Sequence, residues 1–198
     1  GVTEEASNDQ KTLSLCLEEV QSSKYHPYPN FLIMAGDRYG WIPLPYAIEQ
    51  NEYETILKNI DDLSDKELLN TWYKLDENQI PSSYILKKRE KENDGIDYTN
   101  KDTWRKIESQ LKTILQSGVK KSQLREEQKR KYFTSATEAE VIEGIFKYLD
   151  KTEFQNKLLE KDSTLENKDY ESVYAYIRNI KSISNLKDKF IDMDLIKV

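Results

Sequence analysis

A short continuous apolar run, residues 31–35 (FLIMA), constrains the fold more than any other feature of this sequence. Runs of this length without polar alternation are typical of strands buried on both faces, as in parallel sheets. Pro27 and Pro29 precede the run, and a loop, residues 36–41 (GDRYGW), follows it. In open α/β sheets, ligands bind at the carboxyl ends of the strands. The run therefore predicts a central parallel strand with a candidate ligand loop at its end.

Apolar residues at helical spacing predict helices on both sides of this strand. The helices are expected at residues 10–22 and 49–60, after Ser64, from Asp102 to Gly118, and after Ser135. Ser64 and Ser135 are each followed three residues later by a glutamate, which is the spacing of a capping box. We expect Asp102 to cap its helix and Gly118 to end it.

The helical stripes predict which large side chains are buried. Trp72, Trp104 and Phe146 fall on apolar faces, and Cys16 falls on the inner stripe of the first helix. All four are therefore expected in the core. Outside the helices, candidate strands lie at residues 84–86 and 173–177, and residues 190–194 are expected to form another short strand or a terminal turn. The charged residues 87–101 are expected to form an exposed loop.

Composition excludes several classes of protein. The 36 acidic and 30 basic residues give a net charge of -6, which argues against a nucleic-acid partner, and residues 120–131 (KKSQLREEQKRK) are expected to be a solvated helical face. No apolar run approaches the roughly 20 residues that span a bilayer, so no membrane contact is expected. One cysteine, Cys16, and one histidine, His26, predict neither a disulfide nor a metal site. We expect one domain, in the cytoplasm.

Four segments, in order, carry a family resemblance: GVTEEASNDQKTLSLCLEEV, FLIMAGDRYGWIPLP, TWYKLDENQIPSSYIL, and SATEAEVIEGIF with YAYIRNIKSISNLKDKFIDMD. They resemble the DUF4062 domains that precede NACHT modules in telomerase-associated, nephrocystin-like and WD-repeat proteins and in bacterial STAND proteins. The resemblance implies an α/β fold, a TIR-like (flavodoxin-like) parallel sheet flanked by helices, with a helical insertion. It also implies that residues 1–198 are a single DUF4062-like domain from a larger protein. The family's opening strand and helix are absent from this sequence.

The resemblance implies a signalling or effector-adaptor domain of a NACHT-type STAND NTPase, in antiphage defence or a related innate-immunity pathway. Such a domain acts through contacts with a protein partner, through self-association, or through the downstream NACHT/STAND module. No GxxxxGK[ST] motif occurs, so the ATPase is not on this chain. No cofactor is expected under this hypothesis.

The loop at residues 36–41 is the candidate ligand or partner site. Its glycines allow close backbone approach, its arginine can bind an anion, and its two aromatic residues can stack on a base or ribose. In the alternative interpretation the loop is structural, with an internal ion pair and a tryptophan that covers the core. The loop consists of Gly36, Asp37, Arg38, Tyr39, Gly40 and Trp41.

A second hypothesis is an NAD-cleaving enzyme, with NAD as the bound cofactor. TIR domains with this activity use a glutamate on the helix after the corresponding strand, so the resemblance makes Glu52 and Glu54 the catalytic candidates. The Trp-Cys pair that precedes this glutamate in the family is missing, and a helix dipole favours acidic residues in a first turn anyway. His26 lacks a nucleophile nearby and is expected to be a loop residue. Arg178 is expected to pair with Asp192 or Asp194.

Overall fold

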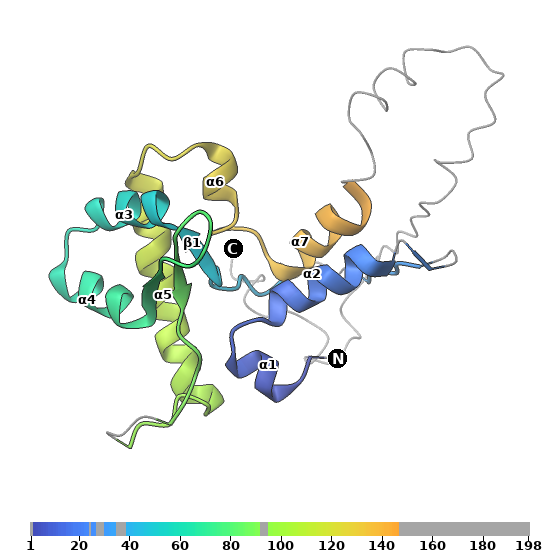
Figure 1. Cartoon of the computed structure of the whole chain (residues 1–198), viewed down its shortest axis with the longest axis horizontal. Coiled ribbons are helices and arrows are strands. Elements are labelled where there is room, and N and C mark those ends of the chain that lie inside the picture. Colours follow the sequence, from blue (N-terminus) through green and yellow to red (C-terminus); the bar gives the residue numbers. More distant parts are fainter. Residues whose placement is uncertain (1, 24, 27–29, 35–38, 92–94, 147–198) are drawn as a thin grey trace, which may run out of the picture.

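The computed structural model describes residues 2–23, 25–26, 30–34, 39–91 and 95–146, and combines helices with one small sheet (Figure 1). The elements are α1 Glu4–Asn8, α2 Thr12–Ser23, β1 Ala47–Glu49, α3 Gln50–Lys58, α4 Leu63–Trp72, β2 Tyr73–Asp76, β3 Ser83–Leu86, α5 Lys101–Lys121, α6 Glu126–Arg130, α7 Ala136–Val141 and a π-helical turn η1 Ile142–Phe146. The predictions for residues 173–178 and 190–194 lie outside the described residues.

The sheet has three strands in the order β1-β3-β2, and both pairings are antiparallel. The central strand β3 confirms the prediction for residues 84–86. Its Tyr84 lies opposite Ile48 of β1 on one side and Leu75 of β2 on the other. Together with the helices, this sheet places the described part of the chain in the mixed α/β class.

The prediction of a central parallel strand at residues 31–35 is wrong for residues 31–34, which belong to no strand, and residue 35 is not described. Leu32 and Met34 are 87% and 89% exposed, so this face of the run is not covered by the described residues. An apolar run without alternation indicates burial but does not specify a pairing partner. In the described residues the ladder is formed instead by β1, β2 and β3, and no parallel pairing occurs among them.

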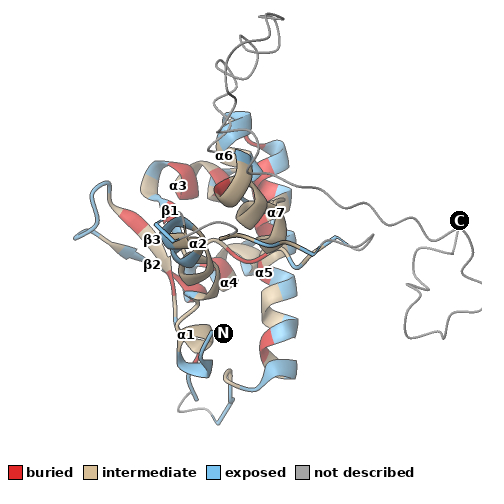
Figure 2. Cartoon of the chain, turned by 90° about the vertical axis from the view of Figure 1, so that its right-hand side faces the viewer, coloured by how far each residue is buried: buried red, intermediate tan, exposed pale blue. Residues whose placement is uncertain are grey.

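The core lies between the sheet and helices α3, α4 and α5 (Figure 2). Helix α3 packs on β1 and β3, and α4 packs on β2 and α5. Trp72 and Trp104 are 3% and 7% exposed, as predicted, and their rings meet edge to face with centroids 5.0 Å apart. Aromatic pairs of this kind stabilise a fold beyond the area that they bury.

Two burial predictions differ from the structure. Phe146 is 56% exposed, because it lies in the π-helical turn η1, where the angular spacing is not the 3.6-residue repeat used to place it. Glu143 is buried in that turn. Cys16 is half-buried on α2, which lies beside α7 in Figure 1. Among the described helices, none is both long and apolar enough to cross a bilayer.

The helix ends also differ from the predictions. Asp62, not Ser64, caps α4, and its carboxylate accepts the Ser64 N–H at 2.7 Å. Asn100, not Asp102, caps α5. In each helix a short acceptor side chain two residues before the predicted cap therefore satisfies the first free N–H groups. Gly118 does not end α5. It is buried inside the helix, which continues to Lys121.

Candidate functional site

The described end of the 36–41 loop docks on the start of α7; residues 36–38, including Asp37 and Arg38, are outside the described residues. The Tyr39 hydroxyl donates to the carboxylate of Glu138 and accepts the Ser135 N–H at 3.1 Å. Ser135 is the N-cap of α7, and its hydroxyl accepts the Glu138 N–H. The predicted capping residue Glu138 thus uses its own carboxylate to hold the loop.

Gly40 has a structural role at this contact. A Cβ at this position would lie 3.1 Å from Thr137 Oγ1 and 3.3 Å from Ser135 Cβ, which is tight for any side chain. Beside it, the Ala136 N–H donates to the Trp41 carbonyl at 2.9 Å. Close backbone approach to α7 therefore explains the glycine at position 40.

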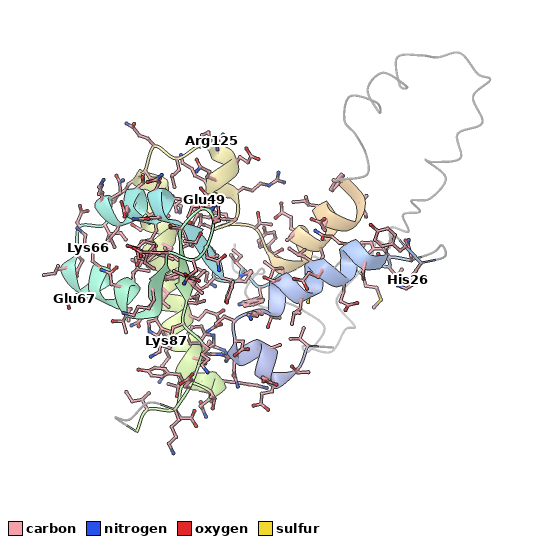
Figure 3. All side chains as sticks on the ribbon, in the orientation of Figure 1. His26, Glu49, Lys66, Glu67, Lys87 and Arg125 are labelled. Atoms are coloured by element: carbon pink, nitrogen blue, oxygen red, sulfur yellow. The ribbon has the colours of Figure 1, made fainter. Side chains whose placement is uncertain are left out.

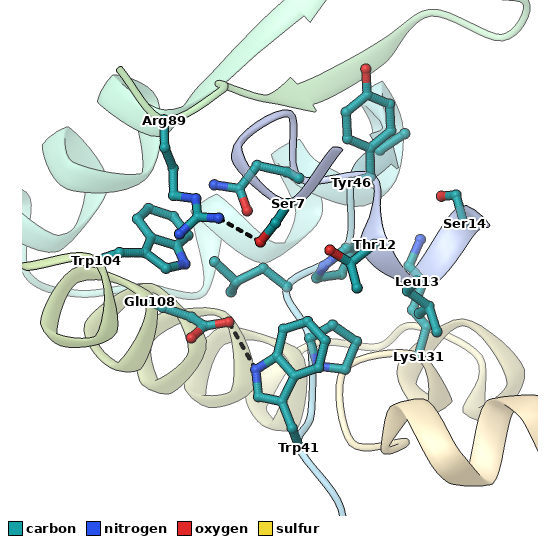
Figure 4. Close-up of a pocket in the computed structure, with 15 residues that line it drawn as sticks. Ser7, Thr12, Leu13, Ser14, Trp41, Tyr46, Arg89, Trp104, Glu108 and Lys131 are labelled. Atoms are coloured by element: carbon teal, nitrogen blue, oxygen red, sulfur yellow. Dashed lines mark hydrogen bonds between the residues drawn. The ribbon is translucent and has the colours of Figure 1, made fainter. Parts of the chain in front are cut away.

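Trp41 extends from this docked segment into a pocket (Figure 4). The pocket has a volume of about 410 Å³, which is in the range of small-molecule sites. Segments that are far apart in the sequence form its walls: the α1–α2 region, the segment before β1, the segment after β3, helix α5 and the segment after α6. The side chains that matter for its chemistry are Gln10, Trp41, Arg89, Trp104, Glu108 and Lys131.

Arg89 lies in the segment that we predicted to be an exposed loop, yet it is only 8% exposed. Its backbone N–H donates to the Asn8 carbonyl at 2.8 Å, and its Nη2 donates to Ser7 Oγ at 2.7 Å. The guanidinium carbon lies 5.4 Å from the centroid of the Trp104 ring, within cation–π range. Burial lowers the pKa of Arg89, although the side chain stays protonated.

Glu108, on α5, is half-buried and accepts the Trp41 indole N–H at 2.9 Å. Removal from water raises the pKa of Glu108 above its ordinary value of 4.5. The hydrogen bond from Trp41, and then the charges of Lys112, Arg89 and Arg105, oppose this shift. The pocket therefore holds a carboxyl group whose charge is costly, next to a buried guanidinium.

The raised pKa of Glu108 leads to a pH prediction. The folded protein binds this proton more tightly than the unfolded chain, so the contribution of Glu108 to stability falls as pH rises from 4.5 to its folded pKa. Because Trp41 donates to this carboxylate, its fluorescence should titrate with a midpoint above 4.5. The Glu108→Gln variant should lose this transition. A midpoint at or below 4.5, or a transition that survives in the variant, would show that Glu108 is not responsible.

Glu52 does not line this pocket, and is 4% exposed. Its carboxylate accepts the Tyr132 hydroxyl at 2.5 Å and the Lys131 ammonium at 3.0 Å. Burial, and then the neighbouring Glu52 charge, raise the pKa of Tyr132 far above its ordinary value. Lys131 also lines the pocket, so it links the pocket to the buried Glu52–Tyr132 pair.

Glu54 lies one turn from Gln50 on α3 and accepts its side-chain amide at 2.9 Å. It does not line the pocket either. His26 is exposed beyond the end of α2 and lies away from the labelled side chains of the sheet and α3–α6 in Figure 3. The structure therefore places neither Glu52 nor Glu54 in the pocket. His26 also lies away from both glutamates.

Arg89, Gln10 and Glu108 were missed as site residues. Arg89 lies in a charged stretch whose composition indicates solvent exposure, and Glu108 lies among polar residues on α5. Gln10 has a positive φ of 63°, which is uncommon for a residue other than glycine, but no sequence signal marks it. Within the described ranges, no group of three or more His, Cys, Asp or Glu side chains is placed to hold a metal ion.

The sequence is similar to a small part of several large proteins. Human NACHT and WD repeat domain-containing protein 2 is 31% identical over 125 residues, which are 57% of this chain and 7% of the relative. Mouse NACHT domain- and WD repeat-containing protein 1 is 34% identical over 88 residues, 43% of this chain and 6% of the relative. The human protein of that name is 25% identical over 203 residues, 98% of this chain and 12% of the relative.

The chain thus spans at most 12% of the length of these curated relatives. No family model matches it, and no solved structure matches it. The similarity to proteins named for NACHT domains is consistent with a NACHT-associated region.

Proposed function

We propose that this chain is a signalling or effector-adaptor module of a NACHT-type STAND NTPase and acts in the cytoplasm through protein contacts. The sequence similarity to proteins named for NACHT domains supports this function. The parent protein would supply the NTPase, because the chain has no P-loop motif. A role in antiphage defence or an innate-immunity-like pathway, and the kinship with DUF4062 and TIR-like domains, are parts of the same proposal. They rest on the four motif segments.

One structural observation carries the idea of a contact surface. In residues 31–34, exposure alternates: Leu32 and Met34 point outward, whereas Phe31 and Ile33 are half-buried. A Cβ on Gly144 would lie 3.0 Å from the Phe31 ring, so Phe31 anchors this segment on the η1 turn. Neighbouring large apolar side chains that stay exposed are candidates for a protein interaction site. We therefore assign the Leu32–Met34 face as the contact surface.

The environments of the two glutamates favour this function over NAD cleavage. A glutamate that stabilises a developing positive charge on a ribose must reach the substrate. The Glu52 carboxylate is buried and occupied by Tyr132 and Lys131. Glu54 is paired within its own helix. These contacts occupy both carboxylates, and no cofactor is part of the proposal.

The competing function is tested by following nicotinamide release from NAD, with this chain and with its complete parent protein. We expect no turnover by either. Glu54→Gln is the informative variant, because Glu54 is half-buried and its loss should leave the fold intact. Turnover by the parent that Glu54→Gln or Glu52→Gln abolished, with unchanged circular dichroism, would reject the adaptor function and establish the enzyme.

A further inference from the structure

We propose that the pocket between Arg89, Gln10 and the Trp41–Trp104 walls binds a monocarboxylate with a flat apolar body. This site is independent of the proposed contact surface, because Leu32 and Met34 do not line it. It is also distinct from the glutamates considered for NAD cleavage, neither of which lines it.

Two unsatisfied donors point to the ligand. Arg89 Nε and Gln10 Nε2 are buried, and neither has a hydrogen-bond partner in the described part of the chain. Both side chains line the same pocket, and more than nine-tenths of Arg89 is buried. A buried donor without an acceptor costs about 1–3 kcal/mol, so a native structure requires a reason for each one. A ligand that supplied acceptor oxygens to both groups would remove the cost.

The remaining Arg89 contacts hold its guanidinium in place. Ser7 Oγ accepts from Nη2, the Asn8 carbonyl accepts from the backbone N–H, and the Trp104 ring lies beside the guanidinium. A guanidinium fixed in this way loses little side-chain entropy when it binds a ligand, and its fork geometry matches a carboxylate. Figure 4 shows Arg89 and Trp104 together on one side of the pocket.

The walls define the body of the ligand. Trp41, Trp104 and Leu44 offer aromatic and aliphatic surface in a pocket of about 410 Å³. Flat apolar groups pack well against indole rings. Glu108 limits the negative charge that the ligand can carry, because its carboxylate lies in the same pocket as Arg89. A second negative charge on the ligand would be repelled by it, so one carboxylate is favoured over a phosphate dianion.

Gln10 allows a test in which stability and binding change in opposite directions. Its backbone has a left-handed φ of 63°, which glycine adopts without strain. Gln10→Gly should therefore leave the melting temperature unchanged or raise it, while it removes one of the two donors. Gln79→Gly is the matched control, because Gln79 is exposed in the β2–β3 connection and does not line the pocket.

The experiment is a titration of the complete chain with phenylacetate, followed through the indole N–H resonances of its tryptophans. A ligand of about ten heavy atoms should bind with about millimolar affinity. We expect saturable shifts of the Trp41 and Trp104 signals, and affinity at least about tenfold weaker in Gln10→Gly and in Arg89→Lys. Glu108→Gln should bind phenylacetate more tightly, and Gln79→Gly should bind it unchanged.

Three results would overturn the assignment. One is the absence of saturable phenylacetate binding in the millimolar range. Another is binding that Gln10→Gly does not weaken although the variant stays folded. The third is benzyl phosphate binding as tightly as phenylacetate, which would show a site for phosphates instead.

Discussion

Replacing Glu52 with alanine is expected to lower the free energy of unfolding by about 2–3 kcal/mol, because a buried hydroxyl loses a charged acceptor. The Tyr132 hydroxyl, on a residue only 2% exposed, would lose its acceptor, and the Lys131 ammonium would lose its anion. Urea denaturation followed by circular dichroism measures the change. Glu52→Gln should cost less, because an amide oxygen can still accept from Tyr132.

Glu54→Ala is the matched control on the same helix. Glu54 is half-buried and accepts a hydrogen bond from the neutral amide of Gln50, so its removal should change stability by about 0.5 kcal/mol or less. If Glu52→Ala were as mild as this control, the Glu52–Tyr132–Lys131 cluster would not be structural. The carboxylate would then again be a candidate for chemistry.

Gly118→Val is expected to destabilise the fold by about 3 kcal/mol, because α3 and α5 meet at this glycine. A Cβ here would lie 2.8 Å from Ile56 Cγ2 and 3.0 Å from the Ile56 carbonyl oxygen. The second contact is with backbone, which cannot move aside as a side-chain end can. Thermal or urea unfolding measures the loss.

Ser117→Val places the same side chain on the exposed face of the same helix. It should change stability by about 0.5 kcal/mol or less. The higher helix propensity of valine than glycine favours Gly118→Val by a few tenths of a kcal/mol, so a net loss would come from the contact with α3. Equal effects of the two variants would show that the helices do not approach as closely as described.

The sequence predicted the long helices because their apolar stripes persist over several turns. Helix α5 carries Trp104 and Leu111 on one face over 21 residues, and both are buried. Gly118 was misread for a physical reason: a glycine marks either a helix end or a close helix contact, and local sequence does not distinguish the two. Here the close contact with Ile56 shows that Gly118 serves a helix contact.

The sheet was harder to predict from the sequence. Each strand of the observed ladder has only three or four residues, so no alternation long enough to identify β1 or β2 is present. The longer apolar run at residues 31–35 gave a stronger signal but no pairing partner. Strand order and direction depend on which segments meet in three dimensions, and a single sequence records that only weakly.

The pocket could not be predicted because segments far apart in the chain form it. Arg89 contacts Ser7, which is 82 residues earlier, and Trp41 contacts Glu108, which is 67 residues later. Of the loop singled out in the sequence, the described residues Tyr39, Gly40 and Trp41 hold α7 in place, and only Trp41 reaches the pocket. Ligand recognition by this loop stays a prediction.

The most direct test of the adaptor function is a calorimetric titration of this chain with the NACHT-containing segment of its parent protein. We expect saturable binding that weakens at least about tenfold in the double variant Leu32→Glu, Met34→Glu, because burying an unpaired carboxylate in an apolar contact is costly. The control is Leu63→Glu with Ile80→Glu, on α4 and in the β2–β3 connection, where both residues are also exposed. Absence of binding, or equal weakening by the control pair, would contradict the proposed contact surface and with it the function.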